Sequence, residues 1–226
     1  GGLGQHDEDE LQRILAGRSL QLSFGIGDDA FTFGGGTSPK DLELTLQLLC
    51  AYLTDPGLRA DVLPRIQRSI SQTYERLLHL PGGIAALKIR PLLASGDPRL
   101  GMPPLERLLA VTAEDVRAWL QPIFAQGALE VAIVGDIDIE QTIALAARTI
   151  GALPSRAEKP AFDKARQVRF PDPAPDAEFT VDTEIQKALA LVFWPTTDSR
   201  DIRRTRRLGL LADVFADRLR KVVREK

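Results

Sequence analysis

The sequence predicts an α+β protein in which helices pack on one face of a mostly antiparallel sheet. Residues 20–33 alternate apolar with polar or small side chains on either side of a Gly-Asp-Asp turn, which is typical of a hairpin with one buried face. Several segments with helical spacing of apolar residues follow, and a short apolar run at 129–134 precedes one more helix. This order of elements favours a two-layer domain.

The composition indicates a folded chain of weakly acidic charge. The 226 residues are 44% hydrophobic, which is enough to bury a core. The formal net charge of -2 gives no overall attraction to nucleic acid or anionic membranes. No apolar run reaches the roughly 18 residues that a membrane helix needs. We therefore expect no nucleic-acid partner and no membrane insertion.

The elements of the first part each have a local signal. Acidic residues open a helical pattern at 7–16, and the hairpin follows it. The stretch "GGGTSPKDLELTLQLLCAYLTDPG" supplies a cap at Thr37 or Ser38, Pro39 in the first turn, and Asp41 near the positive helix end. The leucine-rich remainder predicts a broad apolar helix that ends at "DPG".

Helical patterns dominate the next stretch. We expect helices at 62–80 and at 84–94, the second one interrupted by Pro91. Residues 105–124 read as a helix in two pieces, with "TAED" forming a capping box for the second piece. The apolar run at 129–134 predicts a strand, and residues 138–150 predict a helix.

A second unit is expected beyond a connection that is rich in proline and charge at 154–176. The stretches "EFTVDTE" and "KALALVFWP" predict strands, and a helix is expected from Ser199 to the end. We predict a first domain at 1–157, a linker at 158–178 and the start of a second domain at 179–226. The apolar residues expected to point inward from the last helix are Ile202, Leu208, Leu211, Val214, Phe215, Leu219 and Val222.

No motif predicts a catalytic, phosphate or metal site. "FGGGTSPKD" with Lys40 lacks the GxxxxGK spacing of a phosphate loop, and "VGDIDIE" has one glycine and three acids. His6 and His79 lie far apart, without an HExxH or HxxEH helix. Cys50 lies in an apolar run, where a thiol packs as a small hydrophobic group. We expect a turn with a helix cap, and no metal ligands.

The last helix carries the strongest charge feature. Its basic residues are Arg200, Arg203, Arg204, Arg206, Arg207, Arg218, Arg220, Lys221, Arg224 and Lys226. Because leucines share the helix, an amphipathic helix with a solvated polar face is favoured. No aromatic residues alternate with the arginines for base stacking. An interaction module that binds an acidic protein through this face is the alternative.

Four stretches together resemble the pitrilysin or insulinase family of zinc peptidases. They are, in the family's order, "FTFGGGTSPKDLELTLQLLCAYLTDPG", "VGDIDIEQTIALAARTIGALPSR", "ALALVFWPTTDSRD" and "LADVFADRLRKVVREK". The resemblance implies a LuxS/MPP-like metalloprotease fold that is repeated along a longer parent. It also implies that this chain is the third such domain joined to the start of the fourth, in the non-catalytic C-terminal half.

The resemblance implies an inactive segment. The family's catalytic domain binds zinc through HxxEH and a downstream Glu, and the chain has no such motif. Glu75 is the only acid in the helix where that Glu would fall, so we expect no zinc in this chain and zinc in the parent's catalytic domain. The chain starts without Met and stops within a helical pattern, which predicts a piece of a longer protein. An active member whose HxxEH precedes Gly1 is therefore the second alternative.

The implied role is structural support of proteolysis. We expect the chain to form the wall of a peptide-binding chamber, with the catalytic N-terminal half of the same parent and a peptide substrate as its partners. The parent is expected to be a zinc metalloendopeptidase, and the chain alone to be inactive. Arg224 aligns with a family arginine that contacts substrate. Related two-half bacterial members imply a periplasmic parent.

Overall fold

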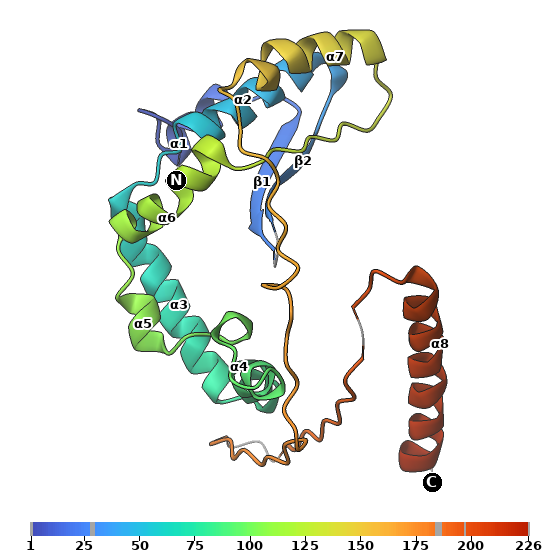
Figure 1. Ribbon diagram of the computed structural model, residues 1–226. Coiled ribbons are helices and arrows are strands. Elements are labelled where there is room, and N and C mark those ends of the chain that lie inside the picture. The colour runs from blue at the N-terminus through green and yellow to red at the C-terminus, as the bar shows by residue number, and fades with distance from the viewer. Residues whose placement is uncertain (1, 28–29, 184–186, 197, 226) are drawn as a thin grey trace.

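A computed structural model describes residues 2–27, 30–183, 187–196 and 198–225 (Figure 1). The helices and strands are α1 (Glu8–Ile14), β1 (Leu20–Ile26), β2 (Phe31–Thr37), α2 (Leu42–Thr54), α3 (Leu63–Leu78), α4 (Pro81–Leu93), α5 (Leu105–Leu109), α6 (Ala113–Gln126), α7 (Ile139–Arg148) and α8 (Ile202–Leu219). Helices together with an antiparallel pair of strands make this an α+β chain, as the sequence predicts.

The elements are arranged as an open arc. The hairpin lies at one end with α1, α2 and α7, and α3 to α5 form the other end (Figure 1). Helix α6 lies between these two groups, and α8 stands apart at the end of a long extended stretch. None of the helices in the described part of the chain combines the length and apolar character needed to cross a bilayer.

The hairpin forms in the predicted place. Strands β1 and β2 pair in antiparallel register from Leu20 opposite Thr37 to Ile26 opposite Phe31. A side chain at Gly35 would place its Cβ 1.9 Å from the carbonyl oxygen of Gln21, so this strand position requires glycine.

One face of the hairpin packs on α6. The ring centroids of Phe24 and Phe33 each lie 5.7 Å from that of Phe124. The core around this contact contains the buried side chains of Leu53, Leu120 and Phe124. The apolar faces of α2 and α6 therefore pack against the strands. This packing holds the first end of the arc together.

The helix caps follow the sequence signals. Thr112 and Asp115 form the capping box of α6: the Thr112 hydroxyl accepts the Asp115 N–H at 3.1 Å, and the Asp115 carboxylate accepts the Thr112 N–H at 2.9 Å. Asp138 caps α7 by accepting the Gln141 N–H at 2.8 Å. Pro91 lies inside α4 near its end, and the helix continues to Leu93.

The strands expected after the hairpin do not form. Residues 129–134 are extended but join no ladder in the described part of the chain, and Val134 is 94% exposed. The described residues of the stretch 178–195 also contain no strand, and residues 184–186 lie outside the description. The physical reason is that a strand requires a hydrogen-bonding neighbour. Within the described residues, β1 and β2 pair only with each other.

The inward-facing side of α8 is also a wrong prediction. Apart from Leu208, which is half-buried, its predicted inward residues are exposed. The ring of Trp194 packs edge-on against Phe215 with centroids 5.7 Å apart. Helical periodicity correctly identifies the apolar face, but no helix or strand among the described residues covers it.

Candidate functional site

Arg224 lies at the end of α8. The helix begins at Asp201, whose carboxylate accepts the N–H groups of Arg203 at 3.0 Å and Arg204 at 3.1 Å. After Leu219 the chain makes a π-helical turn, Arg220–Arg224. The side chain of Arg224 falls outside the described part of the structure, so its substrate contact stays a prediction.

The basic residues of α8 fall into two groups. Near its end, Asp217 accepts from Lys221 at 2.7 Å and from Arg220 at 2.9 Å, and these contacts hold the pKa of Asp217 below its ordinary value. Near its start, no ion pair with a described residue engages Arg203, Arg204, Arg206 and Arg207. The side chains of this first group are exposed.

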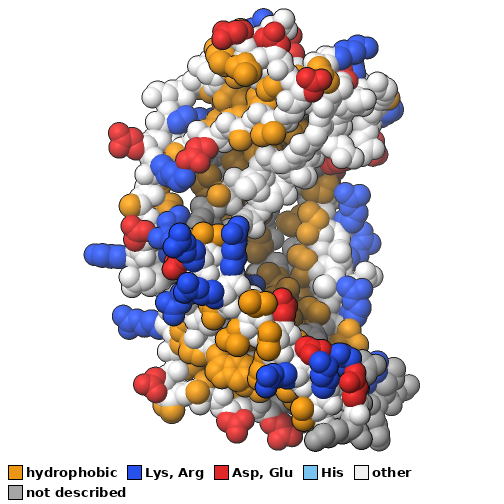
Figure 2. Space-filling view, turned by 90° about the vertical axis from the view of Figure 1, so that its right-hand side faces the viewer, with side chains coloured by type: hydrophobic (Ala, Val, Ile, Leu, Met, Phe, Trp, Pro, Cys, Tyr) orange, Lys and Arg blue, Asp and Glu red, His pale blue; other side chains and the backbone are white. Residues whose placement is uncertain are grey.

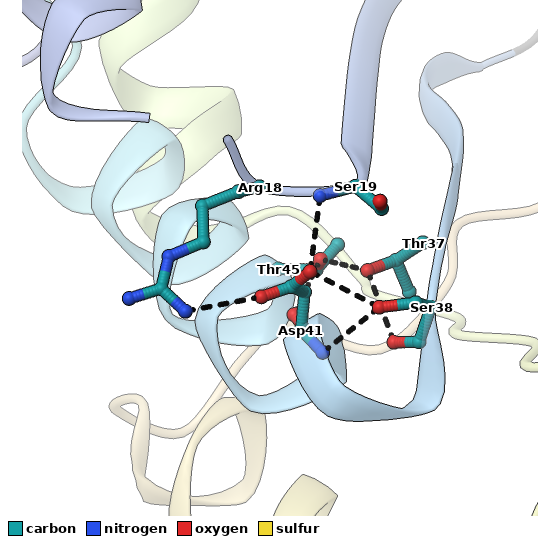
Figure 3. A network of polar contacts seen from close by, with 6 residues as sticks. All are labelled: Arg18, Ser19, Thr37, Ser38, Asp41 and Thr45. Carbon is teal, nitrogen blue, oxygen red and sulfur yellow. Dashed lines mark hydrogen bonds and ion pairs between the residues drawn. The ribbon is translucent and has the colours of Figure 1, made fainter. Parts of the chain in front are cut away.

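The glycine-rich stretch before α2 forms a structural joint. Ser38 caps the short 3-10 turn Pro39–Asp41 that leads into α2, as the sequence predicts. Asp41 is only 5% exposed, and its carboxylate accepts from the Ser19 N–H and the Ser38 hydroxyl at 3.0 Å each and from Arg18 at 3.4 Å (Figure 3). Chiefly the Ser19 N–H, and then the Ser38 and Arg18 side chains, lower the pKa of Asp41.

Two threonines complete this joint. The Thr45 hydroxyl lies 2.8 Å from that of Thr37 and donates to the Asp41 carbonyl at 2.9 Å (Figure 3). The network links the start of β1, the end of β2 and the start of α2. Since its carboxylate oxygens accept from groups of the chain itself, the arrangement serves the fold, and Lys40 has no part in it.

The two histidines each lie beside an oxygen atom of the chain. The Nδ1 atom of His79 lies 3.1 Å from the carbonyl oxygen of Asp182, and Nδ1 of His6 lies 3.7 Å from the Glu10 carboxylate. No group of three or more His, Cys, Asp or Glu side chains converges in the part of the chain that the structure describes. Glu75 is exposed on α3. Partial burial raises the pKa of the Cys50 thiol, which leaves less of the reactive thiolate at neutral pH.

One hollow on the surface lies between α3, α4 and α5, with a volume of about 670 Å³. We call it the α3–α5 groove. Its lining residues are Ser69, Ile70, Thr73, Tyr74, Ala86, Arg90, Arg99, Leu100, Gly101, Met102, Pro103 and Leu108. The sequence alone does not reveal this groove, because a stripe of apolar and hydroxyl residues on α3 is equally typical of a core-facing helix.

A loop held by ion pairing lines part of this groove. Arg99 donates from Nε to Asp97 at 2.9 Å, and this contact lowers the pKa of Asp97 to about 2. Arg99 also donates to the carbonyl oxygens of Ala165 and, at 3.3 Å, Gln167. The proline-rich connection is thereby fastened to the loop.

On the face shown in Figure 2, hydrophobic side chains form open patches with Lys and Arg clustered between them.

A second hollow of about 540 Å³ lies where the later extended segment meets α4. Ile84 and Ile89 line it from the helix, and Phe179 and Leu191 line it from the segment. The apolar residues expected to form core strands of a second unit therefore contact the first part of the chain here.

Comparison with known proteins identifies the family. Residues 110–226 match the sequence model described as "Peptidase M16 inactive domain". Comparison with curated proteins finds no match.

Two solved structures share the fold. One is a mutant of the ferredoxin protease FusC in complex with Arabidopsis ferredoxin, with a TM-score of 0.55 and 18% identity over 71% of this chain and 18% of that chain. The other is a protease from Helicobacter pylori, with a TM-score of 0.57 and 14% identity over 71% of this chain and 39% of that chain. The chain therefore spans less than half of either protein. The sequence match covers more than half of the chain, which confirms the insulinase-like resemblance: the chain belongs to the peptidase M16 family and carries its inactive domain.

Proposed function

We propose that the chain is a wall segment of the peptide-binding chamber in a longer zinc metalloendopeptidase, and that a catalytic N-terminal half of the same protein cuts the peptide. The observation that carries this proposal is the match of residues 110–226 to the inactive domain of the peptidase M16 family. We place the first domain at 1–157, the linker at 158–178 and the second domain from 179.

Open apolar surface supports a larger assembly. Ile139 and Ile143 are exposed on α7, with Ile139 at 67%, and the apolar side of α8 is uncovered. Contiguous exposed apolar surface marks a protein interface more often than a solvated face. In the proposal, other parts of the parent cover these helices, and the chain supplies packing and substrate contacts.

The similar structures support a protein or peptide substrate. One of them is a ferredoxin protease solved with ferredoxin bound, so a protein of this fold does engage a protein ligand. We propose by the same likeness that zinc is held in the parent's catalytic half. A periplasmic location of the parent is proposed from the family resemblance alone.

Metal content and peptidase activity of the purified chain, measured beside the full-length parent with added zinc, test the proposal. We expect zinc and peptide hydrolysis in the parent and neither in the chain, because the described residues bring no three metal ligands together. Stoichiometric zinc in the isolated chain would overturn the proposal. Inactivity of both proteins would favour a binding module instead.

The proposed role of Arg224 has its own test in the parent. A guanidinium that orients a peptide carbonyl contributes mainly to catalysis when it acts in the transition state. We expect Arg224→Ala to lower kcat/KM for peptide hydrolysis at least tenfold, with zinc content unchanged. The nearby Arg218→Ala variant is the matched control. Unchanged hydrolysis by Arg224→Ala contradicts the role.

One observation favours a second candidate function, the binding of an acidic protein partner through α8. The first arginines of α8 form no ion pair with described residues, and an exposed basic amphipathic helix is suited to an acidic protein partner. In that case the chain would bind such a partner in a salt-dependent manner without any catalytic domain.

A further inference from the structure

We propose that the α3–α5 groove binds an acidic peptide segment that inserts an apolar side chain. The inference rests on the proposed function only for its role in proteolysis, where it names the class of substrate that this wall would hold. The binding itself is a property of the described residues and can be measured on the chain alone.

The shape of the groove suits a side chain in an extended segment. Ile70 and Tyr74, one helical turn apart on α3, line one side, and Leu108 of α5 adds apolar surface. On α4 the corresponding position is the small, exposed Ala86, which leaves room above the helix. A Cβ on Gly101 would lie 3.2 Å from the ring of Pro91, so the loop already packs closely on α4.

The charge of the groove is positive. None of its twelve described lining residues is acidic, and Arg90 is exposed without an ion pair to any described residue. Arg99 differs, because Asp97 already neutralises it. Residues 59–110, which form this part of the molecule, contain eight Arg or Lys against four Asp or Glu in a chain of net charge -2. A local positive field therefore surrounds an apolar hollow.

The proline-rich connection is fastened beside the groove. Ser95 donates to the carbonyl oxygen of Arg169 at 3.1 Å, and Arg99 holds the carbonyls of Ala165 and Gln167. These contacts place a segment that contains Lys164 and Arg169 along the loop at the end of the groove. The same connection carries Asp163, which lies beside Arg166 and Arg200, so the unpaired positive charge of the groove lining comes from Arg90.

The recognition chemistry follows from these groups. A peptide carboxylate at the rim accepts charge-assisted hydrogen bonds from the planar guanidinium of Arg90, whose fork matches a carboxylate. A neighbouring apolar side chain of the peptide loses water contact against Ile70 and Leu108. The hydroxyls of Ser69 and Thr73 offer partners for the peptide backbone. A basic peptide would be repelled from the same rim.

Fluorescence anisotropy of labelled peptides on the purified chain tests the proposal. The probe is a short peptide with glutamates around a central leucine, compared with the same peptide carrying Gln or Lys in place of Glu. We expect the Glu peptide to bind, the Gln peptide to bind more weakly and the Lys peptide not to bind. Added salt should weaken the binding of the Glu peptide, since salt screens an ion pair between an exposed arginine and a peptide carboxylate. Equal binding of the three peptides would overturn the proposal.

Variants locate the site. Arg90→Ala should weaken the affinity for the Glu peptide about fivefold, as expected for the loss of one partly exposed ion pair. Ala86→Trp should abolish binding by filling the groove. Arg13→Ala, an exposed arginine on α1, is the matched control and should change nothing, and Arg206→Ala tests binding by α8 instead. Loss of binding with Arg206→Ala but not with Arg90→Ala would move the site to α8 and overturn the inference. Circular dichroism melting of each variant checks that the helices are retained, and the peptide series remains decisive if Ala86→Trp unfolds the chain.

The outcomes separate this inference from the proposed function. If the parent hydrolyses peptides but the chain shows no preference for the acidic probe, the groove inference fails and the wall role stands. If the acidic probe binds through Arg90 but the parent has no peptidase activity, the inference about the groove stands and the proposed function fails.

Discussion

At the scale of single residues, the Asp41 carboxylate joins three elements at their ends. The carboxylate oxygens accept hydrogen bonds from the Ser19 N–H, the Ser38 hydroxyl and Arg18. The backbone N–H of Asp41 donates to the Ser38 hydroxyl at 3.3 Å. A buried carboxylate with this many donors is stabilised in its charged form. The strands and α2 are therefore oriented by polar contacts as well as by the phenylalanine packing.

We predict that Asp41→Asn lowers the melting temperature at pH 7 by several degrees. The pKa of Asp41 is lowered from its ordinary value of 3.8, so its stabilising contribution is present above that value. The contribution is lost as the pH falls through the lower folded-state pKa. The difference between wild type and variant should consequently shrink in acid. Thermal melts across this pH range measure it, with the exposed Asp136→Asn as control. A difference independent of pH would contradict the assigned role.

Residue patterns predicted the local contacts but not the groove. Ser38, Pro39 and Asp41 lie within four consecutive positions, so the turn and cap were readable from the sequence. Arg90 and Ile70 lie twenty positions apart on different helices, and nothing local shows that they line one hollow. The side chain of Arg224 is outside the described part, so its role rests on the family resemblance.

At the scale of elements, helices formed where the sequence placed them, because spacing and caps are local signals. The strands beyond the hairpin did not, because a strand depends on a partner distant in sequence. Apolar alternation identifies a segment able to pair, as at residues 129–134, but it cannot supply the neighbour. This asymmetry explains why the helices were located correctly, although α4 begins at Pro81 and α8 at Ile202, while the sheet was overestimated.

The cap of α6 offers an element-scale prediction. We expect Thr112→Ala to lower the free energy of unfolding by about 1 kcal/mol, since the variant leaves the Asp115 N–H without its intrachain acceptor. Thr112→Ser retains a hydroxyl and should remain close to wild type. Urea unfolding followed by circular dichroism compares the three proteins. Equal loss in the serine and alanine variants would show that the methyl group, not the cap, matters.

At the scale of the whole molecule, the chain has one well-packed end and one uncovered helix. Leu53 is buried at 7% exposure among α2, α6 and the hairpin, whereas Leu211 on α8 is 62% exposed. Two leucines of one chain thus occupy contrasting environments. Substituting each leucine in turn therefore tests whether the core and α8 contribute to the stability of the isolated chain.

We predict that Leu53→Ala lowers the free energy of unfolding of the chain by about 2–5 kcal/mol, because it leaves a cavity in the core. Leu211→Ala should change it by less than about 0.5 kcal/mol, as is usual for an exposed site. In the full-length parent, Leu211→Ala should become destabilising if other domains cover α8. Denaturant unfolding of both proteins measures these changes. A large loss from Leu211→Ala in the isolated chain would show that α8 is already packed in solution.

The fastening of the connection by Arg99 has a consequence for how far α8 can travel. Without it, the extended stretch toward α8 would leave the packed part near Ala157, whose N–H donates to the Gln126 carbonyl oxygen at 2.8 Å. With Arg99 and Ser95 holding the carbonyls up to Arg169, the free tether begins later and is shorter. A shorter tether raises the effective concentration of α8 near α3 and α4. The two side chains of this loop, together with the later contact of Phe179 and Leu191 with α4, therefore limit the reach of α8.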